Sequence, residues 1–129
     1  MAGVTLDAGV LIAAERNDRR FWILWRQIVD IPIVVPAPVL AQVWRGPQSQ
    51  PLARVLRACA IEPMDERLAR MAGEACGRSQ TTDIADAVVV VGAADRGDDI
   101  ITTDLFDIRR LTASVPLRGR VLDFDALRL

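Results

Sequence analysis

Short β-rich segments alternate with longer helical patterns along the chain. Strands are predicted where apolar and β-branched residues cluster, at residues 4–6 (VTL), 31–36 (IPIVVP), 99–103 (DIITT) and 120–124 (RVLDF). Apolar residues at helical spacing predict helices over residues 7–16, 19–30 and 83–94. This alternation predicts an α/β fold with a central parallel sheet covered by helices on both faces.

Local signals place the boundaries of further helices. Pro38 suits the first turn of a short helix that Gly46 is expected to close. Asp65 is predicted to cap a helix, and Thr81 or Thr82 is predicted to cap the very apolar helix over residues 83–94. No repeat or linker-like segment divides the sequence, so we expect one domain over residues 1–129.

Composition narrows the chemistry that the chain can perform. Half of the 129 residues are apolar (51%) and a quarter are charged (26%), which is ordinary for a globular domain. There is no Lys and no His in the sequence. The lack of Lys excludes a Walker A loop, and the lack of His excludes the usual Ser or Cys triads and His-rich zinc sites. We therefore expect any chemistry to depend on carboxylates.

The cysteines and apolar segments indicate the compartment. Cys59 and Cys76 are far apart and form no CxxC pair, so we expect reduced thiols. The apolar N-terminal stretch is interrupted by Asp7 and has no basic region before it, unlike a signal peptide. The segment AVVVVGAA is too short to cross a bilayer. These features predict a cytoplasmic protein without a membrane anchor.

Acidic residues follow two of the predicted strands and open the most apolar helix. Asp7 follows the first strand, Asp104 and Asp107 follow the strand over residues 99–103, and Asp83 and Asp86 lie in the first turn of the helix over residues 83–94. In a parallel sheet, ligands bind at the carboxyl ends of the strands, where loops lead into helices. The topology could therefore bring these carboxylates together.

Helix capping is the alternative explanation for several of these acids. It accounts well for Asp83 and Asp107, because an Asp in a first turn satisfies free N–H groups. Asp7 and Asp86 lie among apolar residues, where a carboxylate does not stay ionised without a partner. If the acids converge, a divalent cation would relieve their repulsion, and oxygen ligands suit Mg²⁺ or Mn²⁺. Sites of this type cleave phosphodiesters.

Three segments in order resemble one known family. TLDAGVLIAA, VPAPVLAQVWRG and TTDIADAVVVVGAADRGDDIITTDLFDI resemble the PIN domain, and specifically the VapC toxins of VapBC toxin–antitoxin pairs. The resemblance covers nearly the whole chain. It implies a three-layer α/β/α, Rossmann-like sandwich with metal-dependent endoribonuclease activity. It also implies a homodimer and a VapB-type antitoxin partner, with no direct DNA binding expected without that antitoxin.

The resemblance also assigns roles to the acids. The first family acid falls on Asp7, the third on Asp86, the fourth on Asp104 and an additional one on Asp107, with Asp83 as a supporting acid. These positions are the implied metal ligands for Mg²⁺, or Mn²⁺ as an alternative.

The second family acid is replaced in this chain. Gln42 stands in VLAQV, where VapC relatives typically have Glu, as in VLAEV. Gln keeps one carbonyl oxygen but removes a negative charge and cannot bind a metal through two oxygens, so weaker metal binding and slower cleavage are expected. A tolerated natural variant, a toxin that has become a binding module, and an introduced substitution all fit this difference. A phosphatase on a related fold is a third, weaker alternative, because the chain has no DxDxT-like segment.

Arginines and tryptophans supply candidate contacts outside the acids. Candidates for phosphate binding are Arg16, Arg45, Arg109 and Arg110. For any single one of them, a solvated helix-face residue that pairs with a nearby Asp or Glu is the favoured explanation. The net charge of −1 argues against a broad basic surface for RNA. In the helix over residues 19–30, an apolar stripe is formed by Phe21, Trp22, Leu24, Trp25, Ile28 and Val29. We expect most of this stripe to pack in the core. For any part that the core does not cover, a dimer or antitoxin contact is favoured over base stacking.

Overall fold

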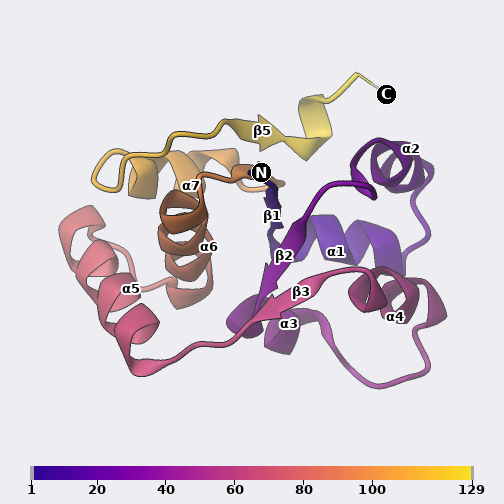
Figure 1. The fold of residues 1–129 in the computed structure, drawn as a ribbon, viewed down its shortest axis with the longest axis horizontal. Coiled ribbons are helices and arrows are strands. Elements are labelled where there is room, and N and C mark those ends of the chain that lie inside the picture. The colour runs from indigo at the N-terminus through magenta and orange to yellow at the C-terminus, as the bar shows by residue number, and fades with distance from the viewer. Residues whose placement is uncertain (1, 129) are drawn as a thin grey trace.

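Five parallel strands form one sheet in the computed structural model, which describes residues 2–128 (Figure 1). The strand order is β3-β2-β1-β4-β5. The strands are β1 (Val4–Leu6), β2 (Ile33–Pro36), β3 (Ala60–Glu62), β4 (Asp99–Thr102) and β5 (Val121–Asp123). The helices are α1 (Ala8–Glu15), α2 (Arg19–Ile28), α3 (Ala37–Val43), α4 (Gln50–Arg57), α5 (Glu66–Ser79), α6 (Ile84–Arg96) and α7 (Leu105–Thr112), and the short 3-10 helix η1 (Phe124–Ala126) follows β5.

The central strands are buried on both faces, as expected for a parallel sheet. In β1, Thr5 faces α6, where its hydroxyl accepts a hydrogen bond from Arg96. Because side chains alternate along a strand, Val4 points to the opposite face, where it lines a hollow with Leu24 and Ile28 of α2. Helices thus cover both faces, and the predicted α/β/α layering is confirmed.

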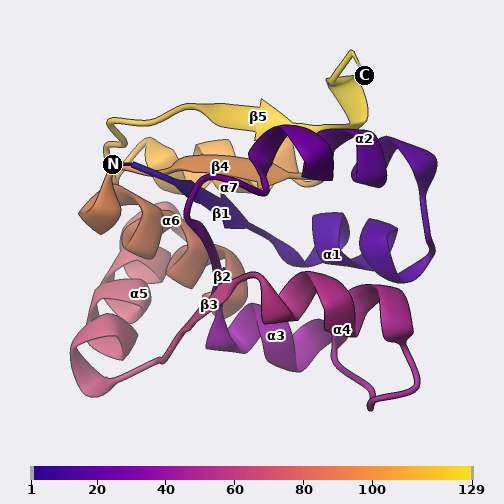
Figure 2. The same ribbon diagram turned by 45° about the vertical axis from the view of Figure 1, so that its right-hand side comes forward.

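The remaining helices group at two ends of the molecule. Figure 2 shows α1, α3 and α4 close together, and α1 packs against both of the others. At the other end, α5 packs along α6, which itself packs on β1, β2 and β4. This arrangement leaves the starts of α1, α6 and α7 near the carboxyl ends of the central strands.

Several boundaries differ from those expected from the sequence. The edge strand β3 was not predicted, because it has only three residues and its pattern carries no buried apolar pair. Helix α3 ends at Val43 rather than near Gly46, since Trp44 adopts an extended conformation. Asp83, rather than Thr81 or Thr82, caps α6 through a hydrogen bond from the Asp86 amide.

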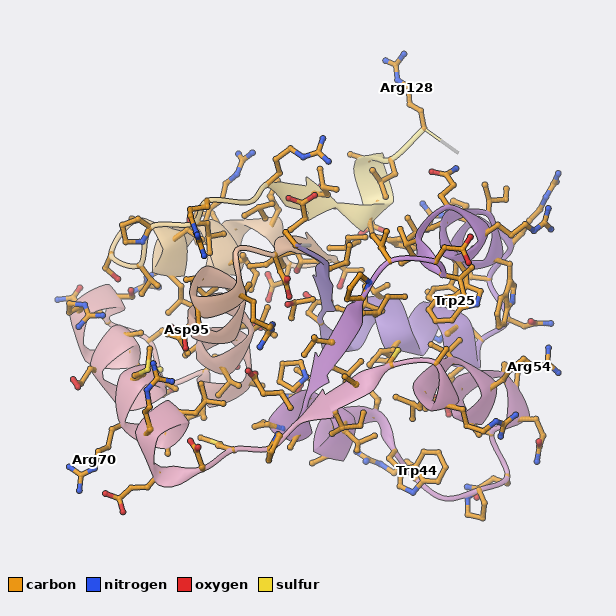
Figure 3. All side chains as sticks on the ribbon, in the orientation of Figure 1. Trp25, Trp44, Arg54, Arg70, Asp95 and Arg128 are labelled. Carbon is orange, nitrogen blue, oxygen red and sulfur yellow. The ribbon has the colours of Figure 1, made fainter. Side chains whose placement is uncertain are left out.

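The apolar stripe of α2 packs mainly against the core. Phe21 is fully buried, and its ring stacks on Trp25 with centroids 5.7 Å apart and meets the edge of Trp22 at 5.1 Å. Figure 3 labels Trp25 on α2. Leu24 is buried as well. Val29, 40% exposed, is the part of the stripe that remains most open. Core packing therefore accounts for most of this segment.

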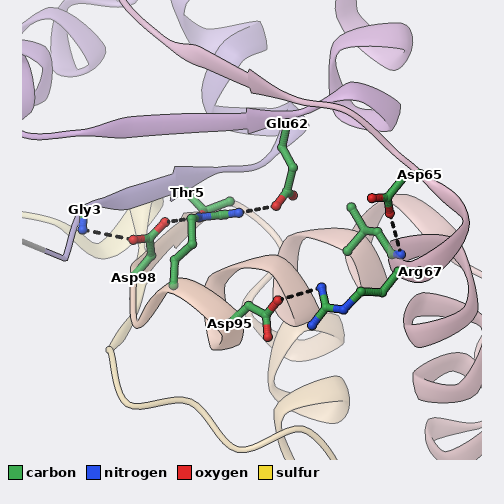
Figure 4. A network of polar contacts seen from close by, with 9 residues as sticks. Gly3, Thr5, Glu62, Asp65, Arg67, Asp95 and Asp98 are labelled. Atoms are coloured by element: carbon green, nitrogen blue, oxygen red, sulfur yellow. Dashed lines mark hydrogen bonds and ion pairs between the residues drawn. The ribbon is translucent and has the colours of Figure 1, made fainter.

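A buried polar network joins β1, β3 and the end of α6 (Figure 4). The carboxylate of Asp98, which is 3% exposed, accepts hydrogen bonds from the Gly3 amide, the Thr5 hydroxyl and the Arg96 guanidinium. Arg96 also pairs with Glu62 on β3. A buried carboxylate requires such partners, so this network stabilises the fold at the amino end of β4.

No helix within residues 2–128 combines the length and the apolar character needed to cross a membrane.

Candidate functional site

Asp7 lies where β1 gives way to α1. It caps α1 by accepting a hydrogen bond from the Val10 amide, and it is only 4% exposed. A second carboxylate oxygen accepts a hydrogen bond from the hydroxyl of Thr102, the last residue of β4. The register of the sheet, in which Leu6 pairs with Ile101, brings these two strand ends side by side.

Thr102 also organises the loop that follows β4. Its hydroxyl oxygen accepts a hydrogen bond from the Asp104 amide at 2.8 Å, while its hydrogen is donated to Asp7. One buried hydroxyl therefore positions two of the predicted site acids. Thr102 was not predicted as a site residue. The feature of the sequence that could have indicated it is a polar residue that ends a strand directly after two isoleucines.

Gly9 permits the close approach of α1 to the same loop. A Cβ atom at this position would lie 1.8 Å from the Oγ1 atom of Thr103, which is far inside van der Waals contact. Only a residue without a side chain fits there unless the loop shifts. Gly9 was likewise absent from the predicted site, because a single glycine in a helical pattern carries no specific signal.

The start of α6 contributes two more acids. Asp83 caps the helix, and its carboxylate accepts a hydrogen bond from the Asp86 amide at 3.0 Å. Asp83 therefore has the capping role that the sequence allowed. The Oδ2 atom of Asp86 is buried and has no hydrogen-bond partner among the described residues. A buried carboxylate oxygen without a partner is costly, so this atom is a ready ligand for a cation.

Three of the predicted acids converge from two separate segments. Asp86 from α6, and Asp104 and Asp107 from the start of α7, each offer a carboxylate oxygen, and these atoms lie within 4.8 Å of one another. Asp7 lies close enough for its charge to raise the pKa of both Asp86 and Asp104. The structure thus gathers Asp7, Asp86, Asp104 and Asp107 at one edge of the sheet.

The electrostatics of this cluster favour protons or a cation. Burial, followed by the charges of Asp83, Asp104 and Asp7, raises the pKa of Asp86 to about 7. Burial and the adjacent Asp107 raise the pKa of Asp104. Burial also raises the pKa of Asp7, although hydrogen bonds from Thr102 and from backbone amides oppose this effect. Crowded carboxylates without a nearby Lys or Arg partner are the arrangement that a divalent cation neutralises.

The donor set fits a hard divalent cation. All of the atoms that the cluster offers to a metal are carboxylate oxygens, which suit Mg²⁺ or Mn²⁺. The Oδ2 atom of Asp86 accepts no hydrogen bond from the described residues, so it can serve as a metal ligand. Asp86, Asp104 and Asp107 are the residues best placed to hold such an ion.

Gln42 is the predicted site residue that the structure does not join to the acids. It lies on the last turn of α3 with an exposed side chain, and no hydrogen bond links it to the acid cluster within residues 2–128. Helix α3 packs against α1 and α6, the helices that Asp7 and Asp83 cap. Its part in the site remains a prediction.

The four candidate arginines divide into two pairs. Arg45 donates to the carbonyl oxygens of Ala41 and Trp44, and Arg110 donates to those of Ser79 and Gln80. These two side chains therefore donate hydrogen bonds to carbonyl oxygens at the carboxyl ends of α3 and α5. In contrast, the side chains of Arg16 and Arg109 have no hydrogen bond or ion pair to the described part of the chain. Arg16 lines a hollow that includes Thr103 of the β4–α7 loop, and Arg109 lines another on the surface of α7.

Comparison with known families identifies the domain. The family model for the PIN domain matches residues 4–112. The chain belongs to the PIN domain family. PIN domains are generally nucleases, and those nucleases generally use divalent metal ions. A comparison with curated protein sequences gives no match.

Solved structures of low sequence identity share the fold. A FitAB complex bound to an IR36 DNA fragment superposes with a TM-score of 0.70 at 16% identity and covers 98% of each chain. VapBC2 from Rickettsia felis, bound to a DNA fragment from its promoter, gives 0.68 at 15% identity and covers 93% of this chain and 98% of that one. DNA-bound VapBC from Salmonella typhimurium gives 0.68 at 14% identity, covering 96% and 99%. The PIN-type fold predicted from the sequence is confirmed.

Proposed function

We propose that this chain is an endoribonuclease that depends on Mg²⁺ or Mn²⁺ and hydrolyses RNA phosphodiester bonds. The observation that carries the proposal is the approach of Asp86, Asp104 and Asp107 within 4.8 Å, beside the buried Asp7. A cluster of carboxylates with one unpaired buried oxygen has little value as a stabilising feature, because like charges repel one another. It is the arrangement that a metal-dependent nuclease requires.

Each acid has a distinct part in this proposal. Asp86, Asp104 and Asp107 would hold the ion. Asp83 positions the first turn of α6, because its carboxylate accepts a hydrogen bond from the backbone amide of Asp86. The hydrogen bond from Thr102 orients Asp7 and favours its ionised form against the larger effect of burial on its pKa. A divalent ion bound by these residues supplies an activated water and neutralises charge on the phosphate. The protein residues position the ion, and a bound cation would in turn favour the ionised form of Asp7, whose burial raises its pKa.

The biological setting that we propose is a type II toxin–antitoxin pair. The solved structures with this fold include FitAB and VapBC complexes. We propose that the whole chain, residues 1–129, forms one PIN domain of the VapC type that dimerises and pairs with a VapB-type antitoxin in the cytoplasm. The low identities mean that these neighbours support the proposal through the fold, while the acid cluster supports the activity.

Cleavage of RNA tests the proposed activity. Single-stranded RNA is incubated with the protein in Mg²⁺ or Mn²⁺, and the products are resolved on a denaturing gel. We expect cleavage that requires the metal and that Asp86→Asn abolishes. The matched control is Asp30→Asn, because Asp30 is exposed and precedes β2, at the opposite ends of the strands. Equal cleavage by Asp86→Asn and the unaltered protein would refute the assignment of the acids.

A second function is favoured by one observation, the uncharged Gln42 on α3. If this residue has disabled the nuclease, the chain is a PIN-fold binding module that still pairs with an antitoxin. The variant Gln42→Glu separates the two functions, because it adds a negative charge on a helix that packs against α1 and α6. Cleavage by Gln42→Glu alone would identify a disabled nuclease. Cleavage by both proteins, faster with Glu, would support the active enzyme.

A further inference from the structure

Among residues 2–128, Phe106 is the most exposed of the large hydrophobic side chains. It is 78% exposed, whereas the next, Val29, is 40% exposed. Phe106 lies in the first turn of α7, between Asp104 and Asp107 in the sequence. A ring that is 78% exposed contributes little to the core, and its place in the segment that carries Asp104 and Asp107 makes it available to a ligand of the acid cluster.

The ring borders a hollow that is built partly from cationic side chains. Leu105, Phe106, Arg109 and Arg110 line this hollow, which has a volume of about 610 Å³. Arg110 is fixed, because its guanidinium donates to the carbonyl oxygens of Ser79 at 2.8 Å and of Gln80 at 2.6 Å. These bonds anchor α7, the helix that carries the ring, to the end of α5.

Of the two arginines that line this hollow, Arg109 is the one whose guanidinium remains available to a ligand. It follows Phe106 by three positions, so both side chains lie on neighbouring parts of the same helix face. Its guanidinium is exposed and has no hydrogen bond or ion pair within residues 2–128. An aromatic face beside a free guanidinium suits a nucleotide, since the base stacks on the ring and the phosphate accepts hydrogen bonds from Arg.

We infer that Phe106 stacks on an unpaired base of single-stranded RNA next to the phosphate at the acid cluster, with Arg109 contacting the adjoining phosphate. This inference rests on the proposed nuclease function and assigns it a substrate subsite. The net charge of −1 gives the chain no overall electrostatic attraction for RNA. A local stacking contact therefore provides affinity that electrostatics does not. Stacking tolerates any base, so this subsite selects unpaired RNA over duplex rather than one sequence.

The test measures RNA affinity for three variants of Phe106. Phe106→Ala removes the ring, Phe106→Leu keeps apolar volume without an aromatic face, and Phe106→Trp keeps a stacking surface. The probes are a short fluorescein-labelled single-stranded RNA of random sequence and a strand of the same length made only of abasic sugar–phosphate units. Binding is followed by fluorescence anisotropy on ice in Mg²⁺, and a denaturing gel verifies that the RNA is intact. Met64→Ala is the matched control, because Met64 is 37% exposed on the loop before α5.

The inference predicts a loss that depends on the bases. Ala and Leu at position 106 should weaken binding of the base-containing RNA by about 5- to 10-fold, toward the lower end of the range for one stacked base. Trp should retain it, and all three variants should bind the abasic strand like the unaltered protein. Met64→Ala should change neither affinity.

The contrary outcomes separate this inference from the proposed function. If Phe106→Ala binds the base-containing RNA as tightly as the unaltered protein, the stacking role is wrong, while the nuclease proposal stands. If that variant instead loses self-association in sedimentation, with RNA affinity unchanged, Phe106 is a protein contact and the inference is also wrong. If the unaltered protein binds no RNA, both the subsite and the proposed function are wrong.

Discussion

Thr102 donates its hydroxyl hydrogen to the carboxylate of Asp7, and so joins the end of β4 to the cap of α1. Both residues are buried: Thr102 has no exposed surface, and Asp7 is 4% exposed. The bond lowers the pKa of Asp7 against the larger effect of burial. It therefore serves both the stability of the fold and the ionisation of a proposed site acid.

Removing this hydroxyl should destabilise the protein. Thr102→Val keeps the shape of the side chain but removes the hydroxyl that donates a hydrogen bond to the buried carboxylate of Asp7. We therefore expect the free energy of unfolding to fall by about 1–3 kcal/mol. Urea denaturation measures the change. Thr102→Ser, which keeps the hydroxyl and loses one methyl group, should cost about 0.8 kcal/mol. If Ser and Val variants are equally destabilised, the hydrogen bond to Asp7 is not the cause.

Two glycines provide a matched pair of substitutions. Gly9→Ala would place a Cβ atom against Thr103, so we expect a loss of about 1–3 kcal/mol in stability, with a displaced β4–α7 loop. Gly73→Ala in α5 meets no atom within 4 Å and should stabilise the helix by about 0.5–1 kcal/mol. Thermal or urea unfolding of both variants checks the prediction. A stabilising Gly9→Ala would contradict the close approach of α1 to the loop.

The ion network around Asp98 should tolerate little change. Burial raises the pKa of Asp98, but hydrogen bonds from Arg96, Gly3 and Thr5 outweigh it and lower the pKa overall. Arg96→Met would leave this buried carboxylate without its cation, and we expect a loss of about 3–5 kcal/mol, measured by urea denaturation. The control is Arg67→Met, whose ion pair with Asp95 is exposed and should leave the stability unchanged. Equal effects would show that the network contributes no more than a surface pair.

Asp86 should make the metal-free protein less stable at neutral pH. Its folded-state pKa is raised from 3.8 to about 7, so the folded state binds more protons than the unfolded state between these values. The stability that Asp86 contributes is therefore present below about pH 4 and is lost as the pH rises toward 7. Against the opposing effect of burial, hydrogen bonds from Arg96, Gly3 and Thr5 lower the pKa of Asp98 below its ordinary value of 3.8, so the loss of stability between this value and pH 7 comes from the acid cluster and not from Asp98.

Melting curves with and without metal measure this effect. In EDTA, the melting temperature should be lower at pH 7.5 than at pH 5, and Asp86→Asn should reduce the difference. Mn²⁺ should raise the melting temperature more at pH 7.5 than at pH 5, because the cation competes with protons for the same carboxylates. A metal-free protein that is equally stable at both pH values would show that Asp86 is not crowded by its neighbours.

The sequence predicted most of the elements that have strong local signals. Asp7 and Asp65 cap α1 and α5, and the apolar run after Asp83 forms α6, which ends at Gly97 in the left-handed conformation that favours glycine. The edge strand β3 was not predicted, because its three partly exposed residues form no periodic pattern of apolar and polar positions. Its pairing with β2 depends on contacts that only the folded chain supplies.

The candidate site was predictable in part. Asp7 and Asp86 were predictable as site residues because each is a charged residue among apolar neighbours, and the structure places both at one edge of the sheet. Thr102 and Gly9 were not predicted, because the role of each depends on contacts between two distant segments. The position of Gln42 relative to the acids also depends on how α3 packs, which no local pattern specifies.

Binding of Mn²⁺ tests the central claim most directly, because it depends on the acid cluster and on no choice of RNA. Electron paramagnetic resonance of free Mn²⁺ during titration gives the affinity and the number of bound ions. We predict that the unaltered protein binds Mn²⁺, that Asp104→Asn reduces the affinity at least about tenfold through the loss of one charged ligand, and that Asp30→Asn leaves it unchanged. Absence of Mn²⁺ binding by the unaltered protein, or equal binding by all three proteins, would contradict the assignment of Asp86, Asp104 and Asp107 as a metal centre.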